Sequence, residues 1–183
     1  MRRRQFLQGV FLLGGGTSML SVRALAGHTD DGMGTVDSAG QTAMDIEKLV
    51  KTDDEWRELL TAAEYDVLRG DGTERPGSSD LNAEKREGTF VCAACGLPLF
   101  KSETKYESGT GWPSFWTPIE GNVETKRDFK LFLPRTEYHC ARCGGHQGHV
   151  FGDGPQPTGK RYCNNGVALD FVPEDEELPE LRS

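Results

Sequence analysis

The stretch "GTFVCAAC" at residues 88–95 runs from strand-forming residues into two cysteines separated by two residues, and "CARC" at 140–143 repeats that spacing 44 residues later. A CxxC turn lets two sulfurs reach one ion, and two such turns complete the tetrahedron that zinc prefers. The sequence therefore predicts a structural zinc site that staples two distant segments. Its four ligands are Cys92, Cys95, Cys140 and Cys143.

Two other readings of the paired cysteines remain open at this point. Two disulfides are the main rival, since disulfides form in exported proteins. A thioredoxin-like redox pair is less favoured, because neither CxxC opens a helix after a strand. His139, beside the second pair, could replace one thiolate, but four cysteines already fill a tetrahedral site.

Length and composition indicate one soluble domain with an N-terminal extension. The chain has 183 residues, of which 36% are hydrophobic, with 23 glycines and 9 prolines, as in a turn-rich domain rather than a helical bundle. The net charge of the chain is -8. The first 26 residues contain four arginines and no acidic residue, so the rest of the chain has 17 basic and 29 acidic residues, a net charge of -12. An acidic domain repels phosphate backbones, and we expect no nucleic-acid partner.

Residues 1–26 have the pattern of an export signal. An arginine pair in "MRRRQFLQG" precedes an apolar run diluted by glycine, and "ALA" at 24–26 supplies small residues for cleavage. The apolar run is shorter than the roughly 20 residues of a membrane span, so no stable membrane association is expected after cleavage. We predict a twin-arginine-type signal and a periplasmic or otherwise exported protein, a route suited to a chain that loads its metal before export.

The rest of the chain divides by composition. Residues 27–47 read as a flexible linker, 48–173 as the folded domain and 174–183 as an acidic tail. Apolar residues at helical spacing after Thr52, with Glu55 completing a capping box, predict one helix, or two with a break near Ala63. From Gly88 onward, short strand-like runs alternate with Gly and Pro turns, which favours a mainly antiparallel β domain.

Cys163, in "TGKRYCNNGVAL", is the one cysteine outside the two pairs. Arg161 lies two residues before it, and a nearby cation lowers the pKa of a thiol and populates the nucleophilic thiolate. His146 and His149 follow the second cysteine pair in a glycine-rich segment and could donate a proton to a developing oxyanion or leaving hydroxide. Trp112, between a glycine and a proline, is a candidate wall for an apolar methyl pocket.

Several motifs together resemble one known family. The stretches "CAACGLPLF" (92–100), "KYESGTGWPSF" (105–115) and "CARCGGHQGHVFGDGPQPTGKRYCNNGVAL" (140–169) are similar, in the same order, to the B-type peptide methionine sulfoxide reductases, which act on the R epimer of the sulfoxide. The likeness covers about residues 50–172. It implies a mainly β fold of two antiparallel sheets with short N-terminal helices, and structural zinc on the four paired cysteines.

The resemblance also assigns roles around a sulfoxide. It implies Cys163 as the nucleophile and Trp112 as the pocket tryptophan. The other residues that match positions around the sulfoxide are His146, His149, Phe151 and Asn165. Arg161 is expected, with the histidines, to keep the Cys163 thiolate populated.

Two positions depart from the family pattern. Many members carry a second redox cysteine where this chain has Thr110, and the residue after Asn165 is often serine where this chain has Gly166. No resolving thiol is therefore expected. Attack on methionine-R-sulfoxide should leave a sulfenic acid that a thioredoxin-like or small-thiol reductant reduces.

Two rival functions are weighed against the reductase. One is a zinc-stapled, non-catalytic binding module in which Cys163 is inert. The other is a general thiol-disulfide oxidoreductase, which would need a partner thiol near Cys163 that the sequence does not supply.

Overall fold

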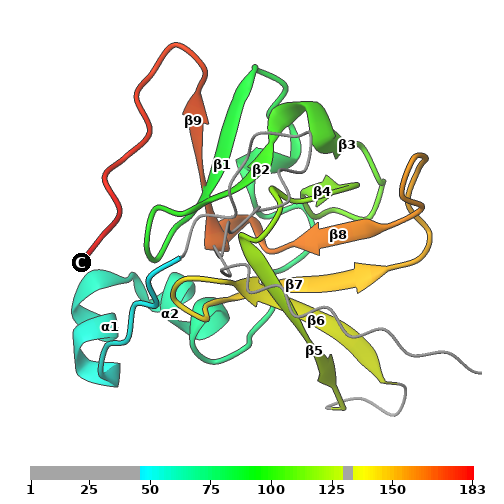
Figure 1. Ribbon diagram of the computed structural model, residues 1–183. Coiled ribbons are helices and arrows are strands. Elements are labelled where there is room, and N and C mark those ends of the chain that lie inside the picture. Colours follow the sequence, from blue (N-terminus) through cyan, green and yellow to red (C-terminus); the bar gives the residue numbers. More distant parts are fainter. Residues whose placement is uncertain (1–45, 130–133) are drawn as a thin grey trace, which may run out of the picture. The chain divides into compact units, whose positions relative to one another are not determined.

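Strand β1 (Gly88–Cys92) forms the centre of a three-stranded antiparallel sheet, flanked by β2 (Pro98–Lys101) and β9 (Leu169–Pro173). The computed structural model describes residues 46–129 and 134–183, which belong to one unit of the chain, 41–183. The run before the first cysteine pair forms a strand, as the sequence indicates, and the structure places it in the middle of its sheet (Figure 1).

A second antiparallel sheet has six strands in the order β3-β4-β8-β7-β6-β5. Its strands are β3 (Lys105–Tyr106), β4 (Ser114–Phe115), β5 (Val123–Asp128), β6 (Arg135–Cys140), β7 (His146–Phe151) and β8 (Arg161–Asn164). In the described residues, two short α-helices precede both sheets. A 3-10 helix at Asp80–Asn82 lies between these helices and β1, and two more, Ser102–Thr104 and Gly166–Ala168, connect strands. The expected fold class, mainly β in two antiparallel sheets with short N-terminal helices, is confirmed.

Aromatic side chains join the two sheets. Phe100 of β2 stacks on Phe115 of β4 with ring centroids 4.1 Å apart, and Phe90 of β1 meets the same ring edge-on at 4.9 Å. Tyr138 and Tyr162 continue the cluster on the six-stranded sheet, with their centroids 5.3 Å apart. Because side chains alternate along a strand, burial of Tyr162 in this cluster directs its neighbour Cys163 to the opposite face of β8.

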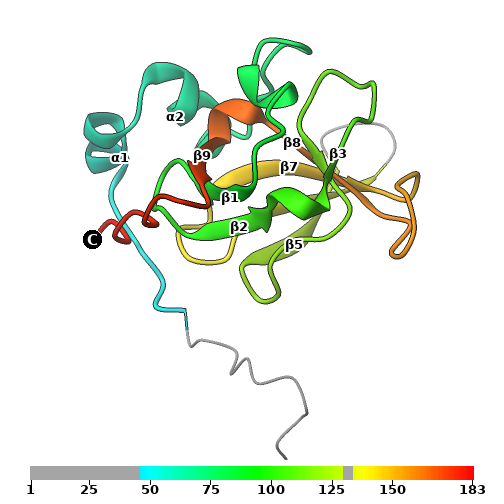
Figure 2. The same ribbon diagram turned by 90° about the horizontal axis from the view of Figure 1, so that it is seen from above.

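The helical segment is two helices, α1 (Asp53–Leu59) and α2 (Ala62–Leu68), seen together beside the sheets in Figure 2. The capping box at Thr52 is confirmed, but a second box, with Thr61 as N-cap and Glu64 at the third position, starts a new helix. The break between the helices lies at Leu60 and Thr61, about two residues before Ala63, because the second capping box starts α2 there.

The segments at either end differ in what the structure describes. The predicted signal of residues 1–26 and most of the linker lie outside the described residues. In the described part, no helix is long and apolar enough to cross a membrane. The acidic tail is exposed, and the backbone N–H of Arg182 near its end donates a hydrogen bond to the carbonyl of Cys95 at 3.1 Å.

Candidate active site and metal centre

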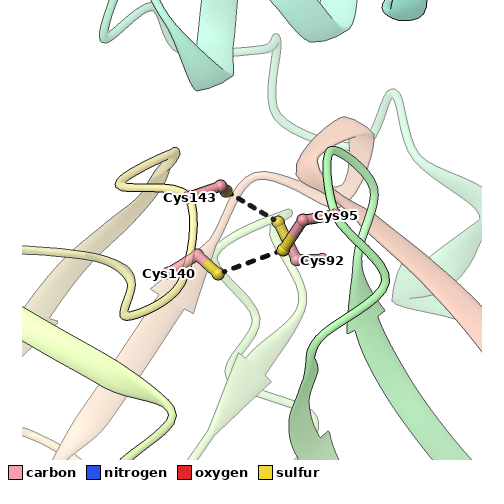
Figure 3. A group of neighbouring side chains, drawn as sticks. All are labelled: Cys92, Cys95, Cys140 and Cys143. Atoms are coloured by element: carbon pink, nitrogen blue, oxygen red, sulfur yellow. Dashed lines mark hydrogen bonds between the residues drawn. The ribbon is translucent and has the colours of Figure 1, made fainter. Parts of the chain in front are cut away.

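The four paired cysteines converge on one point between the two sheets (Figure 3). Cys92 ends β1 and Cys95 lies in the turn after it, while Cys140 ends β6 and Cys143 lies in the turn before β7. All four side chains are buried, and their sulfurs lie within 4.8 Å of one another. Four sulfurs at zinc-bonding distance in a tetrahedron would be about 3.8 Å apart, because each Zn–S bond is about 2.3 Å long.

The sulfur distances decide between metal and disulfides. The Cys92 and Cys143 sulfurs are 3.7 Å apart, and the Cys95 and Cys140 sulfurs are 3.5 Å apart. These close pairs join the two turns rather than the two cysteines of one turn, and none of the five cysteines is in a disulfide. The residues therefore fit a closed structural zinc site, and the two-disulfide reading is not supported.

Both metal turns have the same backbone. In each, the glycine that follows the second cysteine has a positive φ, 76° at Gly96 and 68° at Gly144, and donates its N–H to the carbonyl of the first cysteine of its pair at 2.8 and 2.9 Å. Glycine adopts this left-handed conformation without a Cβ clash. The glycine after each CxxC pair thus permits the turn that brings the two cysteines together.

Other elements close over the metal turns. The Arg69 guanidinium, just after α2, donates to the Cys143 carbonyl at 2.9 Å. The side chain of Gln147 donates to the Cys92 sulfur at 3.5 Å. Contacts of this kind orient ligands and exclude water from a metal site.

One row of paired residues crosses the six-stranded sheet and contains Cys163. Residues that pair in register across antiparallel strands project from the same face. The row, read from β5 to β3, is Lys126, Glu137, His149, Cys163, Ser114 and Tyr106. Polar and reactive side chains that are far apart in the sequence therefore lie side by side on the face opposite the aromatic cluster.

A cavity of about 120 Å³ opens at Cys163. Of the residues predicted around the sulfoxide, it is lined by Trp112, His149, Phe151, Cys163 and Asn165. An indole and a phenyl ring thus line the same cavity as the one cysteine that is not in the metal centre. A small apolar group with one polar atom is the kind of ligand that such a wall accommodates.

Burial governs the state of the Cys163 thiol. It raises the pKa of Cys163 above its usual value, although the charge of Arg161 and hydrogen bonds from Thr110 and Arg161 lower it, and Asp153 adds to the rise. Arg161 thus lowers the pKa of the thiol as expected, but burial outweighs it. Asp153 holds the Arg161 guanidinium through two hydrogen bonds of 2.9 Å, and the guanidinium lies 4.3 Å over the Phe151 ring.

His149 is held by a carboxylate. Its Nε2 lies 2.8 Å from an Asp128 oxygen, which the Arg135 guanidinium also contacts at 2.7 Å. Burial lowers the pKa of His149, while the hydrogen bond with Asp128 opposes the shift. A neutral imidazole that donates from Nε2 to a carboxylate keeps a lone pair on Nδ1. His149 can thus accept a proton on the nitrogen that does not contact Asp128.

His146 lies outside the cavity at Cys163. It lines a neighbouring hollow of about 370 Å³, which His149 also borders, and the two imidazole centroids are 5.4 Å apart. Its Nδ1 is 2.8 Å from the buried carboxylate of Glu137, and its Nε2 is buried with no hydrogen-bond partner among the described residues. The two histidines are therefore not equivalent, and His149 is the one beside the sulfur.

The loop that carries Glu74 fixes Trp112 and Asn165. The indole N–H of Trp112 donates to the Glu74 carbonyl at 3.2 Å, and the Glu74 N–H donates to the side chain of Asn165 at 3.1 Å. The Glu74 carboxylate accepts the N–H groups of Gly166 and Val167. One loop residue thus ties the pocket wall to the segment after Cys163.

Sequence reasoning missed Glu74 and the acids behind the histidines. Glu74 lies in a loop with no motif. Asp128 and Glu137 lie on strands β5 and β6, and an acid inside a strand was a usable signal because charged residues are rarely buried without a partner. Their pairing with histidines depends on strand register, which the sequence pattern leaves open.

Comparison with known proteins gives a consistent picture. The SelR domain matches residues 60–173. The chain is 54% identical over 127 residues to a "Peptide methionine sulfoxide reductase MsrB" of Methanosarcina barkeri, a match that covers 69% of this chain and 89% of the relative. It is 54% identical over 132 residues to the protein of that name from Pseudomonas putida (71% and 98%), and 52% over 131 residues to that from Leifsonia xyli (70% and 94%). With two sheets joined at a four-cysteine metal centre and a fifth cysteine in a small aromatic cavity, the chain belongs to the SelR-domain family of MsrB-type peptide methionine sulfoxide reductases.

Proposed function

We propose that the protein reduces methionine-R-sulfoxide, free or in oxidised proteins, to methionine at Cys163. The observation that carries this assignment is the cavity in which the Cys163 thiol shares its walls with Trp112, Phe151 and His149. The two rings offer an apolar surface for the S-methyl group, and the imidazole offers a polar partner for the sulfoxide oxygen. Family membership supports the same reaction class.

The first chemical stage oxidises Cys163 as the sulfoxide is reduced. The cysteine sulfur attacks the sulfoxide sulfur and forms an S–S bond, and the S–O bond breaks as the protonated oxygen leaves as water. Water then attacks the Cys163 sulfur, the S–S bond breaks, and the products are methionine and a Cys163 sulfenic acid, so the stage is balanced.

His149 is the group that we assign to proton transfer. Because burial keeps Cys163 protonated at neutral pH, its proton must leave as the sulfur attacks. His149 pairs directly with Cys163 across β7 and β8, and its neutral imidazole has a free lone pair on Nδ1. It takes the thiol proton and delivers it to the oxygen, so charge does not accumulate there. His146, whose ring meets that of His149 edge to face, is a supporting group in this scheme.

The second step requires an external reductant. The chain has five cysteines, and four of them form the metal centre. Two thiols, from a thioredoxin-like protein or a small dithiol, reduce the sulfenic acid to the Cys163 thiol and release water as they form a disulfide. The zinc that Cys92, Cys95, Cys140 and Cys143 would hold stabilises the fold when bound.

The leader suggests where the reaction takes place. Residues 1–26 resemble a twin-arginine signal with a cleavage site near residue 26. Export would put the enzyme among proteins exposed to oxidants, where methionine sulfoxide inserts a polar group into apolar surfaces. We propose a periplasmic or otherwise exported repair enzyme, and replacement of Arg3 and Arg4 by lysine should retain the precursor in the cytoplasm.

Separate assays of the two sulfoxide epimers test the assignment. With dithiothreitol, the purified protein should consume the R epimer of a blocked methionine sulfoxide and leave the S epimer, and Cys163→Ser should abolish turnover. Equal use of both epimers would contradict the stereospecific pocket. Turnover of neither, by protein that holds zinc, would favour the non-catalytic binding module instead.

A further inference from the structure

Three hydroxyl groups form a chain in the segment from Ser108 to Ser114 on the β3–β4 side of Cys163. The Thr110 and Ser108 oxygens are 2.8 Å apart, and the Ser108 and Ser114 oxygens are also 2.8 Å apart. Hydrogen bonding by the Thr110 side chain lowers the pKa of Cys163, and Ser114 is the cross-strand partner of Cys163 on β4. We refer to Ser108, Thr110 and Ser114 as the hydroxyl chain.

The hydroxyl chain can reverse its direction without moving heavy atoms. Each hydroxyl has one proton to donate and can also accept. In one direction, the Ser114 hydroxyl donates its proton to the Trp112 carbonyl at 3.1 Å. Ser108 then donates to Ser114, Thr110 donates to Ser108, and the Cys163 thiol donates to Thr110. When the sulfur is negative, rotation of the three hydroxyls turns Thr110 into a donor to sulfur.

The other groups that act on Cys163 are charged or titratable, and Thr110 differs from them as a neutral donor. The titratable and charged side chains that act on it come from several elements: Tyr106 on β3, Tyr138 on β6, His149 on β7, Asp153 after β7 and Arg161 on β8. The Arg161 charge is already shared with Asp153 through two hydrogen bonds. Thr110 is a neutral donor, and Ser108 behind it supports its hydrogen bond to sulfur.

We propose that Thr110, backed by Ser108 and Ser114, stabilises Cys163 whenever its sulfur group is negatively charged, as the thiolate during attack and as the ionised sulfenic acid afterwards. The role rests on the proposed function for its purpose, but the hydrogen bond itself is a property of the free enzyme. It gives the position of the missing second redox cysteine a chemical task of its own. Thr110 is therefore a group that contacts the reacting atom rather than a space-filling substitute.

Alkylation of Cys163 by iodoacetamide as a function of pH tests the proposal, with the modified residue identified by peptide mass mapping. Thr110→Val keeps the shape and removes the donor, so the pKa read from the alkylation profile should rise by about one unit, the order of one hydrogen bond to a charged group. Below that pKa, alkylation should slow about tenfold. Thr110→Ser should restore the wild-type profile, and Ser108→Ala should produce a smaller rise, a slowing of about threefold.

A matched control separates the hydroxyl chain from general loop effects. Thr117→Val removes a hydroxyl that donates to the neighbouring Pro118 carbonyl at 3.5 Å, outside the hydroxyl chain, and should leave the profile unchanged. An unchanged profile in Thr110→Val, or a Thr110→Ser profile that matches valine instead of threonine, would overturn the proposal. Alkylation needs no sulfoxide turnover, so this result stands apart from whether the reductase assay succeeds.

Discussion

Replacement of Gly148 by alanine tests whether close approach of β7 and β8 positions Cys163. A Cβ at residue 148 would lie 1.9 Å from the carbonyl oxygen of Cys163. Unstrained carbon–oxygen contacts begin at about 3.3 Å, so the two strands must separate by about 1.4 Å or twist apart. The atom that must move belongs to the backbone of the proposed nucleophile, which no rotamer change can relieve.

The size of the effect follows from that displacement. Overpacking costs about 1–3 kcal/mol and occasionally more, and a backbone clash places Gly148→Ala near 3 kcal/mol. At about 2–4 °C per kcal/mol, the melting temperature should fall by about 6–12 °C. A shift of about 1 Å in a reacting group lowers catalysis about 100-fold, and we expect that loss in kcat/KM.

Gly152→Ala is the matched control, because a Cβ there meets no atom within 4 Å. Thermal unfolding followed by circular dichroism and the dithiothreitol-coupled reduction of a blocked methionine-R-sulfoxide should be measured on both variants. If Gly148→Ala unfolds within 2 °C of Gly152→Ala and retains its activity, strand proximity at Cys163 does not set the geometry and the reasoning is refuted.

Three further outcomes are expected. Cys140→Ser should lose zinc and become insoluble, because metal binding supplies folding free energy on the order of 10 kcal/mol, whereas Cys163→Ser should keep stoichiometric zinc in metal analysis. The pH profile of kcat/KM should be flat between about pH 6.5 and 8.5, because burial lowers the pKa of His149 and raises that of Cys163. Activity should fall only below this range, as His149 is protonated. A rate that climbs throughout from pH 6 to pH 9 would argue against proton transfer to His149. Arg161→Met should slow alkylation of Cys163 near neutral pH, because it removes the charge that lowers the pKa of the thiol. Lys160→Met, at the exposed neighbouring residue, should not slow it. Equal slowing in both variants would show that the charge acts non-specifically.

Some features could be predicted because they are local. In each C-x-x-C-G segment, the glycine supplies the positive φ that closes the metal turn. The capping box at Thr52 marks the first helix for the same reason. The second box, at Thr61 and Glu64, is equally visible in the sequence. It lies within a continuous pattern of apolar residues at helical spacing, and this pattern favours a single helix over a break at the cap.

The properties of Cys163 show where local reasoning ends. A cation two residues away predicts a lowered thiol pKa, but the sheet buries the sulfur and Asp153 claims much of the Arg161 charge. Desolvation depends on everything packed around a group, which neighbours in sequence do not reveal. Burial is the larger effect here, so the thiol stays protonated until a partner removes its proton.

The ligand set of the metal centre, the strand-rich domain and the single unpaired cysteine could be predicted from the sequence, because each depends on residue type and short spacing. The histidine beside Cys163 and the acid that holds it could be identified only from the packed fold. The register of β5 to β8 places Cys163 opposite His149. Glu137 pairs with His149 across β6 and β7, but its carboxylate contacts His146. A shift of one residue in any of these pairings would turn the side chains to the other face, and register is set by packing of the aromatic cluster between the sheets, a contact between segments far apart in the chain.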